Sequence, residues 1–172
     1  MTRNTSLHHS DYWIEHLALQ PHPEGGYFRE VYRSGEQVRA EHLPDRFKGA
    51  RTFSTAIYYL LRTGERSKLH RIKSDEIWHF YRGLPLTIHM FGAKGSYEAV
   101  RLGDNPEHGE RYQYMVPAGT WFGVTVESAP VPDFSLAGCT VAPGFDFEDF
   151  EMAGDELITA YPGYQDILRK LL

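Results

Sequence analysis

Residues 64–83 read GERSKLHRIKSDEIWHFYRG. A glycine begins and ends this stretch, and between the glycines two segments of alternating apolar and polar residues flank a polar turn. Such alternation is typical of β-strands with one buried face, and glycine suits the tight turns at either end. Because alternate side chains of a strand point to the same face, His70 shares a face with Ile72, and Glu76 shares one with Trp78 and Phe80. We therefore expect an imidazole and a carboxyl group on neighbouring strands.

The rest of the chain extends this β pattern. With 172 residues, of which 14% are aromatic, the chain is long enough for one domain, residues 1–172. Short runs rich in β-branched and aromatic residues, bounded by turn residues, predict nine strands: 26–33, 52–61, 68–72, 76–81, 86–91, 97–102, 112–116, 121–127 and 134–141. No helical segment separates them, which favours antiparallel sheets folded as a jelly roll. The fold class is mainly β, with a barrel core over about 25–143.

Both ends of the chain predict helices. Ser10 is placed to cap one short helix that ends near Leu19, before two prolines. The tail, residues 144–172, predicts a helical turn at 146–151 and helices at 155–160 and 164–171 that pack outside the barrel. Residues 34–50 mix charges with glycine and proline, which indicates a long mobile loop of the kind that serves as a lid or dimer arm.

Charge and composition exclude several classes of function. The net charge is −5 and no long basic run exists, so we expect neither nucleic acid nor an anionic membrane as a partner. No apolar run is long enough to span a bilayer, and the polar N-terminus lacks a signal core, so we expect a cytoplasmic protein. The single cysteine, Cys139, is expected to be a buried apolar residue. Phosphate-loop, serine-elbow and paired-cysteine motifs are absent.

His70 and Glu76 are the candidate catalytic residues. As a metal-free pair, His70 acts as base, and its acidic partner is Glu76, Asp146 or Asp149. As metal ligands, His70 and Glu76 suit divalent iron, manganese, nickel or zinc, so the cofactor is either none or one such ion. Two ligands are few, and a metal centre needs substitutes from His79, His89, Tyr81 or Gln113. A third alternative is a buried pair whose members only satisfy each other.

Two further groups of residues are candidates for substrate binding. Residues 21–34 read PHPEGGYFREVYRS, in which two glycines precede an aromatic strand whose Tyr27, Arg29 and Glu30 offer hydrogen-bonding groups. The alternative is an edge strand whose charges keep it soluble. Aromatic residues predicted near the cavity either line an apolar pocket for a small molecule or fill the core: Tyr58, Trp78, Phe80, Tyr114, Trp121 and Phe122.

The spacing of Gly64, His70, Glu76 and Gly83 resembles the first signature of the cupin superfamily, in which a glycine turn precedes His-x-His, a glutamate and a second glycine. Ile72 stands where the second histidine is usual. The second signature, Pro-x-Gly followed by a histidine, resembles residues 117–123, PAGTWFG, in which Phe122 takes the place of the histidine. The resemblance implies a double-stranded β-helix barrel, while two of the four usual ligand positions are apolar.

Three stretches, 22–34, 70–83 and 141–150, look like those of the cupin 5 family, catalogued as domain of unknown function 985. The resemblance implies a homodimer and no agreed reaction. A fainter likeness to sugar-nucleotide epimerases implies that 26–30 contacts the nucleotide and that His70 is a metal-free base. Three functions stay open: an isomerase-like or epimerase-like enzyme on a carbonyl or sugar-like substrate, a metal-dependent oxygenase or isomerase, and a non-catalytic barrel that binds a small molecule.

Overall fold

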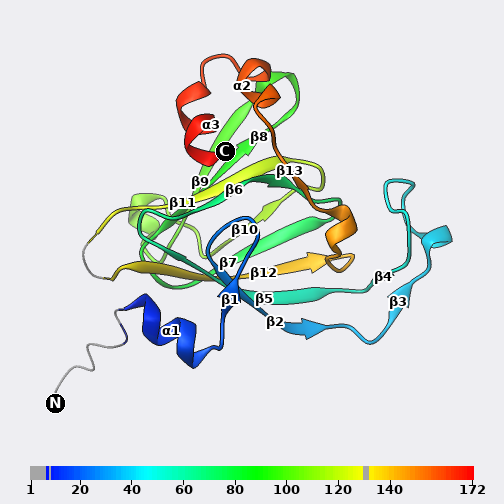
Figure 1. Cartoon of the computed structure of the whole chain (residues 1–172), viewed down its shortest axis with the longest axis horizontal. Coiled ribbons are helices and arrows are strands. Elements are labelled where there is room, and N and C mark those ends of the chain that lie inside the picture. The colour runs from blue at the N-terminus through cyan, green and yellow to red at the C-terminus, as the bar shows by residue number, and fades with distance from the viewer. Residues whose placement is uncertain (1–6, 8, 130–131) are drawn as a thin grey trace.

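The structure, a computed structural model, describes residues 7, 9–129 and 132–172. Its strands form two stacked antiparallel sheets and a small hairpin-like sheet that extends from the body (Figure 1). The larger sheet has the order β1-β2-β5-β12-β7-β10, with strands β1 (Gln20–Pro21), β2 (Tyr27–Arg33), β5 (Thr55–Arg62), β12 (Phe134–Ala142), β7 (Asp75–Gly83) and β10 (Gln113–Val116). The second has the order β13-β6-β11-β8-β9, with strands β13 (Glu151–Met152), β6 (Arg66–Arg71), β11 (Trp121–Val126), β8 (Leu86–Phe91) and β9 (Tyr97–Leu102). The small sheet joins β3 (Gln37–Val38) to β4 (Arg51–Thr52).

The chain passes back and forth between the two large sheets from β5 to β12 and stays within one sheet only at the β8–β9 pair. This is the connectivity of a jelly roll and confirms the predicted fold class. Side chains that alternate inward from both sheets form the main core, which includes Tyr59, Trp78, Phe80, Ile88 and Phe122. The core is apolar because each strand turns its polar residues toward solvent.

Helices cover part of the outer face of each sheet (Figure 1). Helix α1 (Ser10–His16) packs against the six-stranded sheet through a cluster that includes Trp13 and Leu60. Helices α2 (Glu156–Ala160) and α3 (Gln165–Leu171) pack on the five-stranded sheet, where Leu168 and Leu171 bury Leu69. Short 3-10 turns complete the elements: η2 (Ala40–His42), η3 (Ala93–Gly95), η4 (Pro106–His108) and η5 (Phe147–Asp149).

All nine predicted strands are present, two of them with the predicted ends and the others with ends that differ by at most three residues, and the strand predicted at 52–61 is broken at Phe53 and Ser54. The predicted cap of α1 is wrong, because His9 is the N-cap residue and Ser10 begins the helix. The hydroxyl and backbone N–H of Ser10 instead donate to the Asp133 carboxylate. Residues 34–50, predicted as an irregular loop, contain β3 and η2. No helix in the described part of the chain is long and apolar enough to cross a membrane.

Candidate functional site

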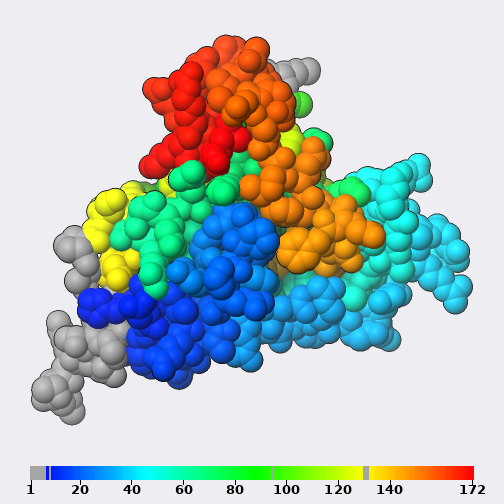
Figure 2. All heavy atoms as spheres, in the orientation of Figure 1, coloured from blue at the N-terminus to red at the C-terminus, as the bar shows by residue number. Residues whose placement is uncertain are grey.

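A cavity of about 270 Å³ lies between the two sheets, under the segment 143–150 that follows β12. Its walls come from both sheets, from the turn before β2 and from this segment. Figure 2 shows residues after 143 (orange) on the surface between the N-terminal strands (blue) and the β3–β4 region (cyan). The lining residues are His22, Glu24, Phe28, Glu30, Arg33, Thr55, Ile57, Tyr59, His70, Ile72, Glu76, Cys139, Val141, Phe145, Asp146, Phe147 and Phe150.

The turn at 22–26 brings Glu24 into the cavity. Gly25 has φ +115°, and a Cβ atom at this position would collide with the backbone carbonyl of Arg66. Only glycine permits both the positive φ and this close approach. The backbone N–H of Lys68 donates to the carbonyl of Glu24 at 2.8 Å, and the Tyr59 hydroxyl donates to the carbonyl of Gly25 at 2.7 Å. The turn is therefore fixed against β6 and β5, with the Glu24 side chain beside β6.

Glu24 is the side-chain partner of His70. Nε2 of His70 lies 3.2 Å from Oε2 of Glu24, and both side chains are buried. The other Glu24 oxygen, Oε1, accepts a hydrogen bond from the Ser67 hydroxyl at 2.9 Å. Nδ1 of His70 lies 2.7 Å from the carbonyl of Lys68, and because a carbonyl only accepts, Nδ1 carries a proton. Nε2 is therefore the ring nitrogen that faces the Glu24 carboxyl group.

His22 borders the same carboxyl group. Its Nδ1 lies 3.6 Å from Oε2 of Glu24 and accepts a hydrogen bond from the backbone N–H of Glu24. Burial lowers the pKa of His22, while the nearby Glu24 opposes the shift and His70 adds to it. His22 is therefore neutral at pH 7, and its ring packs edge-on against Phe28 at 4.5 Å between centroids.

Glu76 enters the cavity from β7 as a neutral acid. Its side chain is 8% exposed, and burial together with the negative charge of Glu24 raises its pKa to about 8. The thiol of Cys139 is its one hydrogen-bonding neighbour among the described residues. Burial also raises the pKa of that thiol, which stays protonated. At pH 7 the cavity thus contains a protonated carboxyl group, that of Glu76, beside the buried contact between His70 and Glu24.

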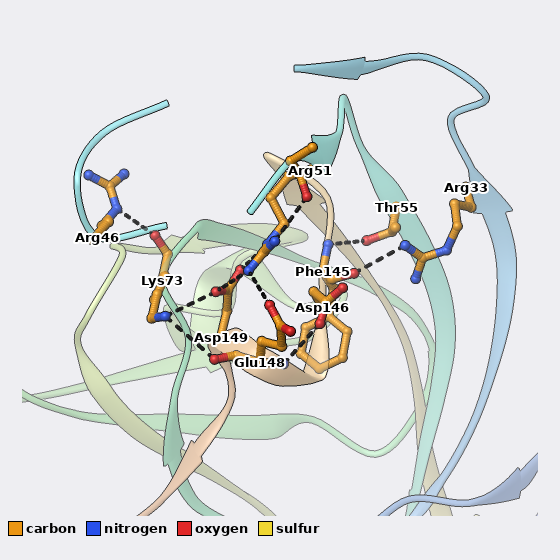
Figure 3. A network of polar contacts seen from close by, with 10 residues as sticks. Arg33, Arg46, Arg51, Thr55, Lys73, Phe145, Asp146, Glu148 and Asp149 are labelled. Carbon is orange, nitrogen blue, oxygen red and sulfur yellow. Dashed lines mark hydrogen bonds and ion pairs between the residues drawn. The ribbon is translucent and has the colours of Figure 1, made fainter. Parts of the chain in front are cut away.

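The segment 143–150 forms the outer wall through Phe145, Phe147 and Phe150. A network of polar contacts holds it to the barrel (Figure 3). Thr55 accepts a hydrogen bond from the backbone N–H of Phe145 at 3.0 Å, and Nη1 of Arg33 donates to the carbonyl of the same residue at 3.2 Å. These contacts place the three rings over the cavity.

An ion pair anchors the far end of this segment. Arg51 donates through Nε and Nη2 to both carboxylate oxygens of Asp149 at 2.7 and 2.8 Å, and Nζ of Lys73 lies 3.2 Å from Asp149 (Figure 3). Both Arg51 and Asp149 are buried. Burial alone raises the pKa of Asp149, but the hydrogen bonds from Arg51 and Lys73 outweigh it and hold this pKa below its usual value. Asp149 therefore acts as a charged anchor on the outside of the cavity wall.

The structure brings His70, Ile72 and Glu76 to one cavity, as the strand alternation indicates. His70 and Glu76 make no hydrogen bond to each other among the described contacts, and the acidic partner of His70 is Glu24. Of the predicted substrate-binding residues, Glu30 alone lines the cavity, at its mouth.

The other predicted binding residues lie elsewhere, which corrects the expectation that they line the cavity. Arg29 donates to the carbonyl of Leu17, and Tyr27 and Tyr58 pack with the α1 cluster on the outer face. The remaining aromatic residues belong to the core: Trp78, Phe80, Phe122 and, half-buried, Tyr114. Phe122 still packs against the imidazole of His70, with ring centroids 4.2 Å apart. Trp121 lies on the opposite face of β11, under the guanidinium of Arg71.

The donor set does not fit a resident divalent metal. Within residues 7, 9–129 and 132–172, no group of three or more His, Cys, Asp or Glu side chains has the geometry to hold an ion. Nε2 of His70, the atom that a metal needs, faces Glu24. The proposed substitutes point elsewhere: His79 bonds Thr140, His89 bonds Tyr97 and Thr125, and Tyr81 and Gln113 are exposed. Burial lowers the pKa of His89 to about 4, so it is a neutral structural histidine.

Sequence reasoning missed Glu24, His22, Tyr59 and Phe28 as lining residues. The available signal was the Pro-His-Pro-Glu-Gly-Gly run at 21–26, whose paired glycines indicate close approach of another backbone. The sequence prediction assigns substrate binding to residues that follow the glycines, whereas the functional groups of His22 and Glu24 precede them.

Comparison with known proteins agrees with this architecture. The family model described as Cupin superfamily (DUF985) matches residues 11–153. An uncharacterised protein of Saccharomyces cerevisiae, YML079W, is 32% identical over 155 residues, covering 84% of this chain and 76% of the relative. A crystal structure of protein SO0799 from Shewanella oneidensis is 40% identical with a TM-score of 0.82 and covers 94% of this chain and 96% of its own.

A hypothetical protein from Leishmania major is 35% identical with a TM-score of 0.84 and covers 94% of this chain and 97% of its own. Oxalate decarboxylase from Bacillus subtilis shares the fold alone, at 16% identity and a TM-score of 0.55, over 90% of this chain and 37% of the decarboxylase chain. The family match and the identities above 30% over most of the chain decide the assignment. The protein belongs to the cupin superfamily, in the family designated DUF985.

Proposed function

We propose that this protein is a metal-independent enzyme that moves a proton on a compact carbonyl or sugar-like substrate, in an isomerase-like or epimerase-like reaction. The observation that carries the proposal is the buried His70–Glu24 pair, 3.2 Å apart, in the cavity that also contains the neutral Glu76. Such a reaction needs a group that accepts a proton and a second group that donates one, both in the same cavity.

The roles follow from the geometry. Nδ1–H of His70 donates to the carbonyl of Lys68, so the imidazole presents Nε2 as its basic atom, with Glu24 beside it. The His70–Glu24 pair takes up a proton from the carbon next to the substrate carbonyl, and Glu76 donates a hydrogen bond to the carbonyl oxygen. Return of the proton to the other face, or to the neighbouring carbon, completes the reaction without an external oxidant or reductant. The role of His70 as a metal-free base is also what the faint sequence resemblance to sugar-nucleotide epimerases implies, with Phe122 in place of their second-signature histidine.

Deuterium exchange tests the proposal. Tag-free protein is incubated in D₂O with a panel of keto sugars and small ketones, and NMR follows deuterium at the carbon next to the carbonyl. We expect exchange with the parent protein, loss to background in His70→Asn, and exchange unchanged by chelator. His79→Asn is the matched control, because His79 lies on the outer face of the six-stranded sheet.

Each other outcome identifies a different function. Exchange that survives His70→Asn refutes the assigned base. Exchange that disappears with chelator and returns with iron, manganese, nickel or zinc supports the metal-dependent alternative. Saturable binding of panel members with no exchange supports a barrel that binds its ligand without turnover.

We also propose that the protein forms a homodimer through the outer face of the six-stranded sheet. Ile77 on β7 and Met115 on β10 are direct neighbours on this face, and both are exposed, as is Tyr81. Large apolar side chains gathered on the part of a sheet face that no helix covers, here the part away from α1, are typical of an interface.

A further inference from the structure

Carboxyl groups outnumber guanidinium and ammonium groups in the cavity wall. Four lining residues carry carboxyl groups, and the one guanidinium among the lining residues belongs to Arg33. Nε and Nη2 of Arg33 donate to the Glu30 carboxylate at 2.9 and 2.7 Å, and Nη1 donates to the carbonyl of Phe145. His70 is likewise engaged, with Lys68 and Glu24. The one guanidinium of this wall is therefore already paired with a carboxylate.

The mouth of the cavity combines aromatic rings with a carboxylate. Phe145, Phe147 and Phe150 lie with centroids 5.0 to 6.2 Å apart and with interplanar angles of 70° to 81°. Because the ring planes are nearly perpendicular to one another, their faces point in different directions. The face of an aromatic ring attracts a cation. Asp146 lies between two of these rings in the chain, and its Oδ1 accepts the backbone N–H of Glu148 at 2.9 Å.

A second, independent observation points to a ligand. Glu76 is more than nine-tenths buried and lines the inner end of the same cavity. Among the described residues its one hydrogen-bonding neighbour is a thiol, which is a weak partner. A buried carboxyl group in a polar setting ordinarily has a good partner, so a ligand with a hydrogen-bond acceptor is the natural complement.

We propose that the ligand of this cavity is a compact organic cation, whose ammonium group lies against Phe145, Phe147 and Phe150 beside Asp146 and whose uncharged oxygen reaches Glu76. This inference deepens the proposed function, on which it rests for the inner end of the ligand, and it makes the substrate an amino-bearing carbonyl or sugar-like compound. The cavity volume of about 270 Å³ corresponds to about nine water molecules, which suits a molecule of monosaccharide size.

Three probes of nearly equal shape and different charge test the charge preference: choline, 3,3-dimethyl-1-butanol and 3,3-dimethylbutanoate. NMR of protein with labelled phenylalanine rings measures binding at pH 7. We expect choline to shift the signals of Phe145, Phe147 and Phe150 and to bind about tenfold more tightly than the alcohol, a difference of about 1.4 kcal/mol. The carboxylate is expected to bind most weakly.

Variants separate charge from shape. Asp146→Asn keeps a side chain able to accept the Glu148 N–H, and we expect it to reduce choline affinity toward that of the alcohol while leaving alcohol binding unchanged. Phe147→Ala is expected to weaken choline binding, whereas Phe53→Ala, at an exposed ring outside the lining, is expected to have no effect.

Two results overturn the proposal: binding of the alcohol or the carboxylate as tight as that of choline, and no choline-dependent shift of these rings at the highest usable concentration. Failure of the cation inference is distinguishable from failure of the proposed function. If deuterium exchange depends on His70 but the protein does not bind choline, the charge preference alone is refuted. Choline binding without such exchange refutes the proton transfer alone.

Discussion

Replacing Glu76 with glutamine should change how the stability of the protein depends on pH. The folded protein raises the pKa of Glu76 from its ordinary 4.5 to about 8, because burial and the charge of Glu24 disfavour the ionised form. Between these values the folded state binds a proton that the unfolded state has lost. The contribution of Glu76 is therefore most favourable below pH 4.5 and is lost progressively as the pH rises to about 8.

The magnitude follows from the shift. Each pH unit within this window costs about 1.4 kcal/mol of unfolding free energy, so by pH 7 the buried glutamate costs about 3 kcal/mol relative to pH 4.5. Glutamine resembles the protonated acid and does not titrate. The difference in stability, Glu76→Gln minus parent, should thus rise by about 1.4 kcal/mol per pH unit from pH 5 to 8, whatever constant offset the amide adds.

Urea denaturation of parent and variant at pH 5, 6, 7 and 8 measures this difference. Glu36→Gln, at an exposed glutamate, is the control. Its unfolding free energy should depend on pH in the same way as that of the parent. If the unfolding free energies of Glu76→Gln and the parent change with pH in the same way, the reasoning is refuted, because Glu76 would then titrate normally in the folded state. A variant that is uniformly less stable and loses a bound metal would instead identify Glu76 as a ligand.

Three further predictions concern the rest of the architecture. Arg51→Met should lower the unfolding free energy by about 3 kcal/mol by leaving the buried Asp149 without its bidentate partner, and a double variant with Asp149→Leu should recover much of the loss in denaturant titrations. Gly25→Ala should destabilise by about 2 kcal/mol or more in the same assay, whereas Gly35→Ala, where a Cβ meets nothing within 4 Å, should change stability little; equal effects would contradict the strained-turn argument. Ile77→Lys should convert the proposed dimer to a monomer in light scattering, and a dimer that persists would place the interface elsewhere.

The sequence predicts the barrel well because the barrel depends on local patterns. Strand alternation places His70 and Ile72 on the inner face of β6 and Glu76 on the inner face of β7, and the structure agrees. Alternation does not distinguish a core position from a cavity position, since both face inward. Trp78 and Phe122 accordingly fill the core, although the same pattern made them candidates for the pocket.

The partner of His70 could not be predicted by the same means. Glu24 is 46 positions away in the chain, in a turn whose location depends on the fit of Gly25 against the backbone of Arg66. That fit is a long-range backbone contact, which no local periodicity encodes. The paired glycines signalled that some backbone approaches closely, but they could not identify which one.

The chemistry of the site follows from where the two nitrogens of one imidazole point. At the cupin ligand positions this chain keeps His70 and Glu76 and has Ile72 and Phe122 in place of the two other histidines, so two of the three residues that would share a metal with His70 are apolar. The Lys68 carbonyl accepts a hydrogen bond from Nδ1–H and directs Nε2 to the Glu24 carboxyl group, which occupies the direction in which an ion would bind. A nitrogen that faces a carboxyl group in this way is better placed for proton transfer than for coordination. Glu76 stays protonated in turn because burial and the charge of Glu24 disfavour its ionised form, and this combination of groups supports the acid–base chemistry that we propose.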